Sequence, residues 1–300
     1  MCHVAIFRNG NAPTIPLFFR FPAQNMNQST SANPGGYSLG RWNPLRMIRH
    51  DVRPESIYFF TFHKCASTLF SSYVLKNIQG LEHVDYAQQD FEGQAAENSH
   101  YEPRGHAYGP IRLSRKASTD AQLYDKLVSP LIQRRFIRKR IALVLVRDPR
   151  DIAISYYYSL GFSHVLSPIE KVRGKQLEQR RRVSAMTLDE YVISDMPWIV
   201  RDFALAEKLL GDCSRATLLK YEDMILNWDR FARDLTRHIT LEDDVLDSIY
   251  EQSRPRDEED IMAHRRSGKT EGFREKLKPE TIMRVNETLV PVFERFGYRP

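Results

Sequence analysis

Short apolar runs, each followed by a polar turn and then by apolar residues at helical spacing, recur along the chain from residue 56 onward. Residues 141–146 are apolar at every position, which indicates a strand buried on both faces, as in a parallel sheet. Residues 57–61 and 216–219 have the same character, and a weaker run covers 106–111. Such strand-then-helix units predict an α/β fold: a central parallel sheet flanked by helices, with ligands bound at the carboxyl ends of the strands.

Helices are predicted where the apolar spacing changes from two residues to three or four. Residues 69–78 carry such a pattern directly after the first strand. Asp148 and Pro149 form a start signal, because aspartate accepts from free amides and proline suits the first turn. Residues 187–210 are expected to be helical, and apolar residues from 282 to 296 predict an amphipathic C-terminal helix.

Composition divides the chain into two parts. Residues 1–55 are rich in Asn, Pro, Ser and Gly and predict an irregular N-terminal arm, whereas residues 56–300 are expected to form a single α/β domain. With 300 residues and 42% hydrophobic side chains, the chain can bury one large core. No apolar run reaches the roughly 18 residues that a membrane span needs. The start has no signal-peptide layout, so a cytoplasmic protein without a membrane partner is expected.

The net charge of +6 is divided evenly, because residues 1–130 and 131–300 each contribute +3. No segment is basic enough to predict nucleic-acid binding. The basic clusters at 134–140 and 180–182 are best explained as solvated helix faces, whereas Arg265 and Arg266 suggest an anionic ligand. Three widely spaced cysteines form neither a zinc pattern nor a disulfide framework, and no metal is expected.

The first polar turn follows the strand at 57–61 and offers one lysine, Lys64, and two hydroxyls, Ser67 and Thr68. Backbone amides and hydroxyls at a helix start form an anion site, and the lysine adds a mobile positive charge. The turn is not a Walker A motif, because the lysine precedes the loop and the glycines are missing. An ordinary strand–helix turn with a surface lysine would explain this segment equally well.

The second polar turn follows the strand at 141–146. Arg147 closes the strand, where a solvated role is awkward and an anion-binding fork is natural. Ser155 follows about two helical turns later and could reach the same anion. Together the two turns predict sites for two separate phosphate-like groups, and hence an enzyme that uses a doubly phosphorylated nucleotide.

Four segments in this order resemble the sulfotransferases that use 3′-phosphoadenosine-5′-phosphosulfate (PAPS). Residues 63–68 are similar to the 5′-phosphosulfate loop P-K-x-G-T-T, and residues 147–155 match the 3′-phosphate motif R-x-P-x-D-x-x-x-S. Residues 220–224 resemble the Y-E-D segment near the adenine, and residues 264–274 the late R-K-G-x-x-G loop over the 3′-phosphate. The resemblance implies a P-loop-like nucleotide-binding fold and a nucleotide site formed by Lys64, Cys65, Ala66, Ser67, Thr68, Arg147, Ser155, Tyr221, Arg265, Arg266, Ser267 and Gly268.

The chain departs from the family pattern at several positions. His63 replaces the usual proline, Ala66 a glycine and Ser67 a threonine, although the hydroxyls are kept. Leu69 stands where many members have a tryptophan that stacks on the adenine. The kept hydroxyls are consistent with phosphosulfate binding, and the leucine lacks the aromatic ring that would stack on the adenine.

The resemblance also implies a mechanism. The sulfuryl group would pass in line to an acceptor hydroxyl or amine, and Lys64 would stabilise the charge that grows on the bridging phosphate oxygen. A histidine removes the acceptor proton in many members, and His106, between the two phosphate motifs, is our prediction for this role. His100, Glu102 and His164 are the rival positions.

Two other functions remain open at this stage. A small-molecule kinase with a divergent P-loop would depend on magnesium, and a non-catalytic nucleotide-binding protein would not need Lys64. The acceptor is expected to lie against residues 80–135 and 160–200, the variable stretches. A small-molecule or glycan acceptor is our prediction, a lipid or a peptide stays open, and the sequence leaves the oligomeric state open.

Overall fold

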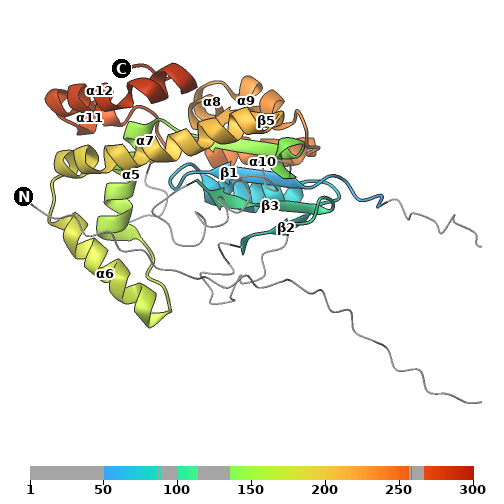
Figure 1. Ribbon diagram of the computed structural model, residues 1–300, viewed down its shortest axis with the longest axis horizontal. Helices are drawn as coiled ribbons and strands as arrows, with labels where there is room; N and C mark the ends of the chain where they lie inside the picture. Colours follow the sequence, from blue (N-terminus) through green and yellow to red (C-terminus); the bar gives the residue numbers. More distant parts are fainter. Residues whose placement is uncertain (1–50, 87, 89–100, 114–135, 257, 259–266) are drawn as a thin grey trace, which may run out of the picture. The chain divides into compact units, whose positions relative to one another are not determined.

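A computed structural model describes residues 51–86, 88, 101–113, 136–256, 258 and 267–300. The predicted arm falls almost wholly outside these residues, as do His100, Arg265 and Arg266. At the centre lies a five-stranded sheet in the order β2-β3-β1-β4-β5, in which every pair of neighbours is parallel (Figure 1). The strands are β1 Ile57–Thr61, β2 Glu82–Val84, β3 His106–Arg112, β4 Ile141–Val146 and β5 Arg215–Lys220. This arrangement confirms the predicted α/β class.

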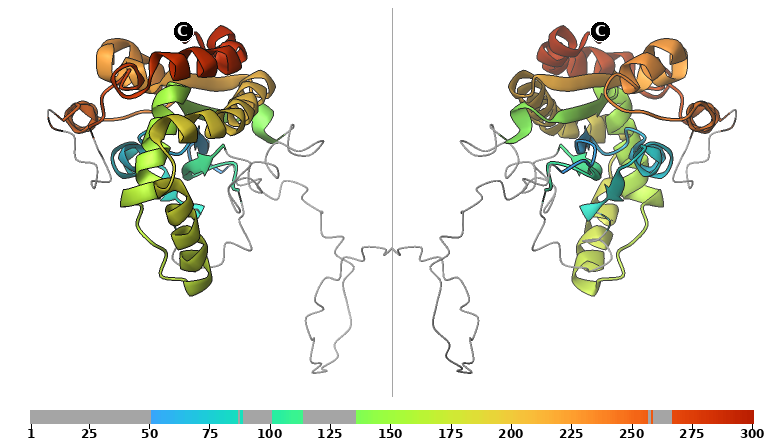
Figure 2. Two further views of the ribbon diagram at one scale, coloured as in Figure 1. Left: turned by 90° about the vertical axis from the view of Figure 1, so that its left-hand side faces the viewer. Right: turned by 90° about the vertical axis from the view of Figure 1, so that its right-hand side faces the viewer.

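The helical segments connect and flank these strands (Figure 1). Long helix α7 packs against α5 and α12, and the helical turn after β1 packs against α10. Helix α6 projects away from the sheet in all views (Figure 2). The helices are α1 Ser67–Leu69, α5 Pro149–Tyr158, α6 Glu170–Ser184, α7 Leu188–Asp212, α8 Tyr221–Leu226, α9 Trp228–Leu235, α10 Asp243–Ser253, α11 Phe273–Lys276 and α12 Pro279–Phe296, with π turns η1 Phe70–Val74 and η3 Ser159–Ser163 and a 3₁₀ turn η2 Leu75–Asn77.

Local signals in the sequence explain where two of these helices begin. Asp148 caps α5 by accepting from the Arg150 amide, with Pro149 in the first turn. Thr187 caps α7 in a capping box with Glu190, in which each side chain accepts from the other residue's backbone amide. The helix expected at 69–78 is irregular instead: a three-residue α-helical start passes into a π turn and then a 3₁₀ turn.

The core is built around β1 and β4, in which every residue is buried. Phe59 of β1 stacks on Phe70 with the ring centroids 4.5 Å apart, which fixes the helical turn against the sheet. The register pairs Thr61 with Leu145 and Val146 with Lys220. Because β1, β4 and β5 are parallel and in register, the residues that follow them lie along one edge of the sheet. This edge carries the predicted nucleotide motifs.

Candidate nucleotide site

The turn after β1 has a strained backbone. Lys64 and Ala66 have φ values of 66° and 56°, in the left-handed region that side-chain-bearing residues rarely adopt. Such a conformation costs about 1–3 kcal/mol per residue and is found mainly at functional sites. Ala66 occupies the position of the glycine in the P-K-x-G-T-T pattern. The strain therefore arises from the sequence, because glycine would adopt this conformation at little cost. The turn keeps the geometry although it lacks the residue best suited to it.

A cavity of about 620 Å³ opens beside this turn. Its volume lies in the range usual for sites that hold a small molecule or cofactor. The segments after β1, β4 and β5 all contribute to the cavity wall, together with the late segment at 267–268. The predicted residues that line it are Lys64, Ala66, Ser67, Thr68, Arg147, Ser155, Tyr221, Ser267 and Gly268.

Cys65 is the described member of the predicted set that does not line the cavity. Its side chain is fully buried, and its thiol donates to the His63 carbonyl at 3.7 Å. Burial raises the pKa of the Cys65 thiol to about 12, so the group stays neutral. Any contribution of Cys65 to a ligand therefore comes from its backbone.

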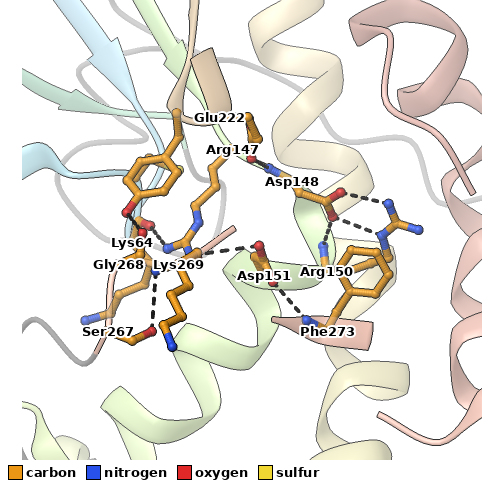
Figure 3. A network of polar contacts seen from close by, with 12 residues as sticks. Lys64, Arg147, Asp148, Arg150, Asp151, Glu222, Ser267, Gly268, Lys269 and Phe273 are labelled. Carbon is orange, nitrogen blue, oxygen red and sulfur yellow. Dashed lines mark hydrogen bonds and ion pairs between the residues drawn. The ribbon is translucent and has the colours of Figure 1, made fainter. Parts of the chain in front are cut away.

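Arg147 joins three parts of the site (Figure 3). Its Nη1 donates to the Lys64 carbonyl at 3.1 Å, and its Nη2 donates to the Lys269 carbonyl at 2.9 Å. The guanidinium carbon lies 4.3 Å from the centroid of the Tyr221 ring. Arg147 is only 8% exposed although it lines the cavity, so it fixes the protein around the cavity as well as presenting charge to it.

Tyr221 holds the late segment in place. Its hydroxyl donates to the Gly268 carbonyl at 2.6 Å, and its ring is buried against Arg147. The Ser267 hydroxyl accepts from the Lys269 amide at 3.4 Å, which closes the turn of this segment. Tyr221 and Gly268 are therefore coupled across 47 residues of sequence, a contact that the resemblance to the Y-E-D segment did not predict.

Asp148, Arg150 and Asp151, just after Arg147, are buried in the protein. Arg150, only 1% exposed, makes two hydrogen bonds to Asp148, at 3.0 Å from Nε and 2.7 Å from Nη2. It also donates to the Asn286 side chain and the Arg299 carbonyl, and its guanidinium lies 3.8 Å from the Phe273 ring centroid. This arginine therefore ties the turn after β4 to the C-terminal helix and the residues behind it (Figure 3).

Asp151 and Glu222 complete this buried network. Asp151 Oδ1 accepts from the Phe273 amide at 3.1 Å, and its other oxygen lies 3.9 Å from Arg147. Glu222 accepts from the Asp148 amide at 2.8 Å and from the Tyr298 hydroxyl at 3.2 Å. Burial raises the pKa of Glu222 to about 7, because the opposing hydrogen bond from Asp148 does not offset the loss of solvation.

His106, our predicted base, lies at the other end of the sheet. It is the first residue of β3, with its Nε2 3.7 Å from Glu82 and its Nδ1 3.1 Å from the Arg104 carbonyl. Arg112 at the last position of the strand lines the cavity, roughly 20 Å further along at about 3.3 Å per residue. The prediction is therefore corrected, because a base at the amino end of a strand cannot reach a site at its carboxyl end.

Sequence reasoning missed Arg112 and His63, which both line the cavity. Arg112 was detectable in principle, because it follows an apolar run and a parallel strand must end at the same edge as β1. His63 adjoins Lys64, and burial together with Arg112, Lys64 and His164 holds its pKa well below the usual range. The His63 imidazole is therefore neutral near pH 7.

A second cavity of about 540 Å³ adjoins the first and shares His63, Lys64 and His164 with it. The rest of its wall comes from α5, η3, α6, α7 and Met186, which lies between α6 and α7. His164, one of the rival positions for the base, thus lies where the two cavities meet.

Within the parts of the chain that the structure describes, no group of three or more His, Cys, Asp or Glu side chains could hold a metal ion. Among the same residues, no helix combines the length and the apolar character that crossing a bilayer requires.

No protein-family model and no curated protein matches the chain by sequence. Solved structures do match, among them the mouse sulfotransferase SULT7A1 complexed with PAP, at 13% identity and a TM-score of 0.49. The match covers 83% of this chain and 87% of that chain. A likeness of this size does not assign a family.

Proposed function

We propose that the protein is a sulfotransferase that moves the sulfuryl group from PAPS to a hydroxyl or amine of an acceptor and releases 3′-phosphoadenosine-5′-phosphate (PAP). One observation supports the proposal: the segments that follow β1, β4 and β5 line a single cavity, with a lysine and two hydroxyls from the first segment and an arginine and a serine from the second. Two separated anion-binding groups in one cavity suit a nucleotide with phosphates at both ends.

The residues of the first turn would bind the phosphosulfate end. The hydroxyls of Ser67 and Thr68 would donate to the 5′-phosphate, with the amides of Cys65 and Ala66 beside them. Lys64 would stabilise the negative charge that grows on the bridging oxygen as the bond between sulfur and that oxygen breaks. Charge stabilisation of this kind commonly contributes about 10²–10³ in rate.

The 3′-phosphate end would lie against Arg147 and Ser155. Gly268 and Ser267 would close over it, and we keep Arg265 and Arg266 in this role as part of the proposal. Tyr221 would act through its ring and through its bond to Gly268, whose carbonyl it already holds. Nothing in this scheme requires a metal ion.

We assign the role of base to His63 in place of His106. Among the described histidines, His63 and His164 are the pair that line both cavities. The acceptor proton would pass to the neutral His63 imidazole as the new bond between the acceptor oxygen and sulfur forms, and PAP would leave with the electrons of the broken bond. His63→Asn should lower turnover by about 10²-fold or more while PAP affinity stays within a few-fold.

The matched variants are His106→Asn and His164→Asn, assayed under the same conditions. Turnover should be unchanged in His106→Asn, because that side chain lies at the far end of the sheet. Full turnover in His63→Asn with a loss in His164→Asn would move the assignment to His164. A loss confined to His106→Asn would contradict the site as we describe it.

The proposal as a whole is tested by calorimetric titration of the protein with PAP, without and then with magnesium, and with ATP as the comparison ligand. We expect PAP to bind without metal and more tightly than ATP. No binding of PAP, or a clear preference for magnesium-ATP, would contradict the sulfotransferase proposal and favour a kinase with a divergent phosphate loop.

A further inference from the structure

The wall of the cavity of about 620 Å³ has a charged part and an uncharged part. Among the described residues, the charged side chains of this wall all come from the carboxyl ends of strands: Lys64 follows β1, Asp85 follows β2, Arg112 ends β3 and Arg147 follows β4. The helical segments α1, η1, α5, α8 and α10 contribute uncharged side chains. A nucleotide has the same division, because its phosphates are charged and its base is not.

Two sides border the uncharged part that lies away from the phosphate motifs. One side is the helical turn after β1, and the other consists of residues in α8 and at the end of α10. The residues are Leu69, Ser72 and Tyr73 on the first side and Met224, Gln252 and Ser253 on the second. Helix α10 packs against both α1 and η1, so the two sides border the same part of the cavity.

The second side is fixed by Arg254, the residue after α10. Its Nη2 donates to the Met224 carbonyl at 2.6 Å and to the Ser253 hydroxyl at 3.1 Å, and its Nη1 donates to the Ile225 carbonyl at 3.0 Å. These hydrogen bonds tie the end of α10 to α8. A ligand that enters between the two sides therefore meets a rigid wall here.

The first side offers the aromatic ring of Tyr73. Leu69 and Tyr73 are four residues apart, which puts them on one face of the helical turn. Phe70 fixes this turn against the core, because it is fully buried, stacks on Phe59 and meets Phe231 edge-on with the ring centroids 6.2 Å apart. Tyr73 itself is partly buried against the core and lines the cavity.

A second tyrosine lines the cavity, but its ring already has a partner. The guanidinium carbon of Arg147 lies 4.3 Å from the centroid of the Tyr221 ring, and the Tyr221 hydroxyl donates to the Gly268 carbonyl. Within the described part of the chain, Tyr73 has neither an aromatic partner nor a cation over its ring. Tyr73 is therefore the tyrosine of this wall whose ring a ligand can cover.

The local backbone gives a second reason to single out Tyr73. It lies inside the π turn η1, in which the Leu75 amide donates to the Phe70 carbonyl, and π turns are rare and often mark functional sites. At about 1.5 Å per residue, Tyr73 lies roughly 7 Å beyond Thr68 along the axis of the turn. The Thr68 hydroxyl is proposed to bind the 5′-phosphate, and a spacing of this size suits the separation of that phosphate from the base.

We propose that the base of the nucleotide lies in this uncharged part of the cavity and stacks on the ring of Tyr73. The proposal rests on the proposed function, because it takes PAP as the ligand. Tyr73 then supplies the ring that Leu69 lacks. Stacking accepts every base, since every base has a π face, so Tyr73 adds affinity rather than a preference for adenine.

The test compares three ligands that carry the same two phosphates: PAP, guanosine 3′,5′-bisphosphate and methyl riboside 3,5-bisphosphate, which has no base. Each is titrated calorimetrically into the full-length wild-type protein and its variants, without magnesium. Tyr73→Leu should weaken the binding of PAP and of the guanosine ligand by about tenfold each, as expected for the loss of one base stack. The same change should leave the binding of the base-free ligand within about twofold of wild type.

Tyr73→Phe is the matched control. It keeps the ring and removes only the hydroxyl, so its affinity for PAP should stay within about twofold of wild type. Unchanged binding of the base-free ligand to Tyr73→Leu shows that this variant keeps its fold and its phosphate site.

Wild-type affinity for PAP in Tyr73→Leu would overturn the inference, as would a loss of affinity that the base-free ligand shares. Equal losses in Tyr73→Phe and Tyr73→Leu would assign the effect to the hydroxyl, and a loss confined to PAP would assign it to recognition of adenine; both results contradict stacking. If PAP binds the wild-type protein and Tyr73→Leu changes nothing, this inference fails and the sulfotransferase proposal stands. If PAP does not bind the wild-type protein, the proposed function fails and the inference fails with it.

Discussion

The turns after β1 and after β4 have the same local design, a buried strand followed by a polar turn and a helix, but they differ in what their side chains touch. In the first turn, Lys64, Ser67 and Thr68 line the cavity of about 620 Å³, and the backbone is strained. In the second, Asp148 and Arg150 are buried in bonds to other parts of the protein. The first turn is therefore suited to bind a ligand, and the second chiefly builds the site around it.

The partners of the second turn explain why the sequence did not reveal this difference. Arg150 contacts Asn286 and Arg299, more than 130 residues further along the chain. Arg147 has both roles: it lines the cavity, and it also holds the protein together by donating to the Lys64 and Lys269 carbonyls. The comparison thus predicts that changes in the two turns will separate stability from catalysis.

The largest effect on stability should come from Arg150→Met. The change leaves the buried Asp148 carboxylate without its partner and should lower the free energy of unfolding by about 3–5 kcal/mol. Urea denaturation of wild type and variant measures the difference. Arg237→Met, which removes a half-exposed arginine paired with Asp234 at 2.8 Å, should cost less than about 1 kcal/mol. Similar losses in both variants would show that the second turn has no special role in stability.

Lys64→Ala should have the largest effect on turnover. Removing the positive charge should lower kcat by about 10²–10³, with a smaller change in PAP affinity. The free energy of unfolding should change by less than about 0.5 kcal/mol, because the side chain faces the cavity rather than the core. Steady-state kinetics measure the change in kcat, and urea denaturation measures the change in the free energy of unfolding. Lys76→Ala serves as the control, because this lysine is exposed and lies in the 3₁₀ turn η2.

The fold was predictable from local patterns wherever burial is complete. The strands β1 and β4 were predicted at their observed residues, because a strand covered on both faces is apolar throughout. The strand β2, Glu82–Val84, was missed, since a three-residue edge strand with polar side chains has no such pattern. The irregular turn at 70–77 was expected to be a regular helix, because π and 3₁₀ turns share the apolar spacing of an α-helix.

The lining of the cavity was predictable where a residue directly follows a strand, and through the family resemblance at Ser155, Ser267 and Gly268. Lys64 and Arg147 line the same cavity, as the sequence predicts, because the carboxyl ends of parallel strands meet at one edge. His106 was wrongly chosen, since its position between two motifs says nothing about which end of β3 it occupies.

Arg147→Ala should affect both stability and ligand binding, and each effect should be smaller than the effects expected for Arg150→Met and Lys64→Ala. Loss of a charged hydrogen bond should weaken PAP binding by about 1.5–3 kcal/mol, measured by calorimetry. Arg147→Lys should recover little of this, because one ammonium group cannot replace a guanidinium that spans the Lys64 and Lys269 carbonyls. Wild-type affinity in Arg147→Ala would mean that this arginine only supports the cavity. Full recovery in Arg147→Lys would mean that charge alone matters.

The smallest effect should be a pH dependence that arises behind the second turn. The pKa of Glu222 is about 7 in the folded protein and 4.5 as a free side chain, so between these values the folded state holds a proton that the unfolded state has released. The stability from this group is present below about pH 4.5 and is lost as the pH rises through about 7. Glu222→Gln resembles the protonated form and should be more stable than wild type by about 1–2 kcal/mol at pH 8 and not at pH 4.5, less than the full shift would give. Urea denaturation between pH 4.5 and 8 measures the difference, with Glu287→Gln on the exposed side of α12 as the control. A constant difference in the free energy of unfolding between Glu222→Gln and wild type over this range would mean that Glu222 is ionised in the folded protein at every pH tested. The hydrogen bonds from Asp148 and Tyr298 would then be strong enough to replace its hydration.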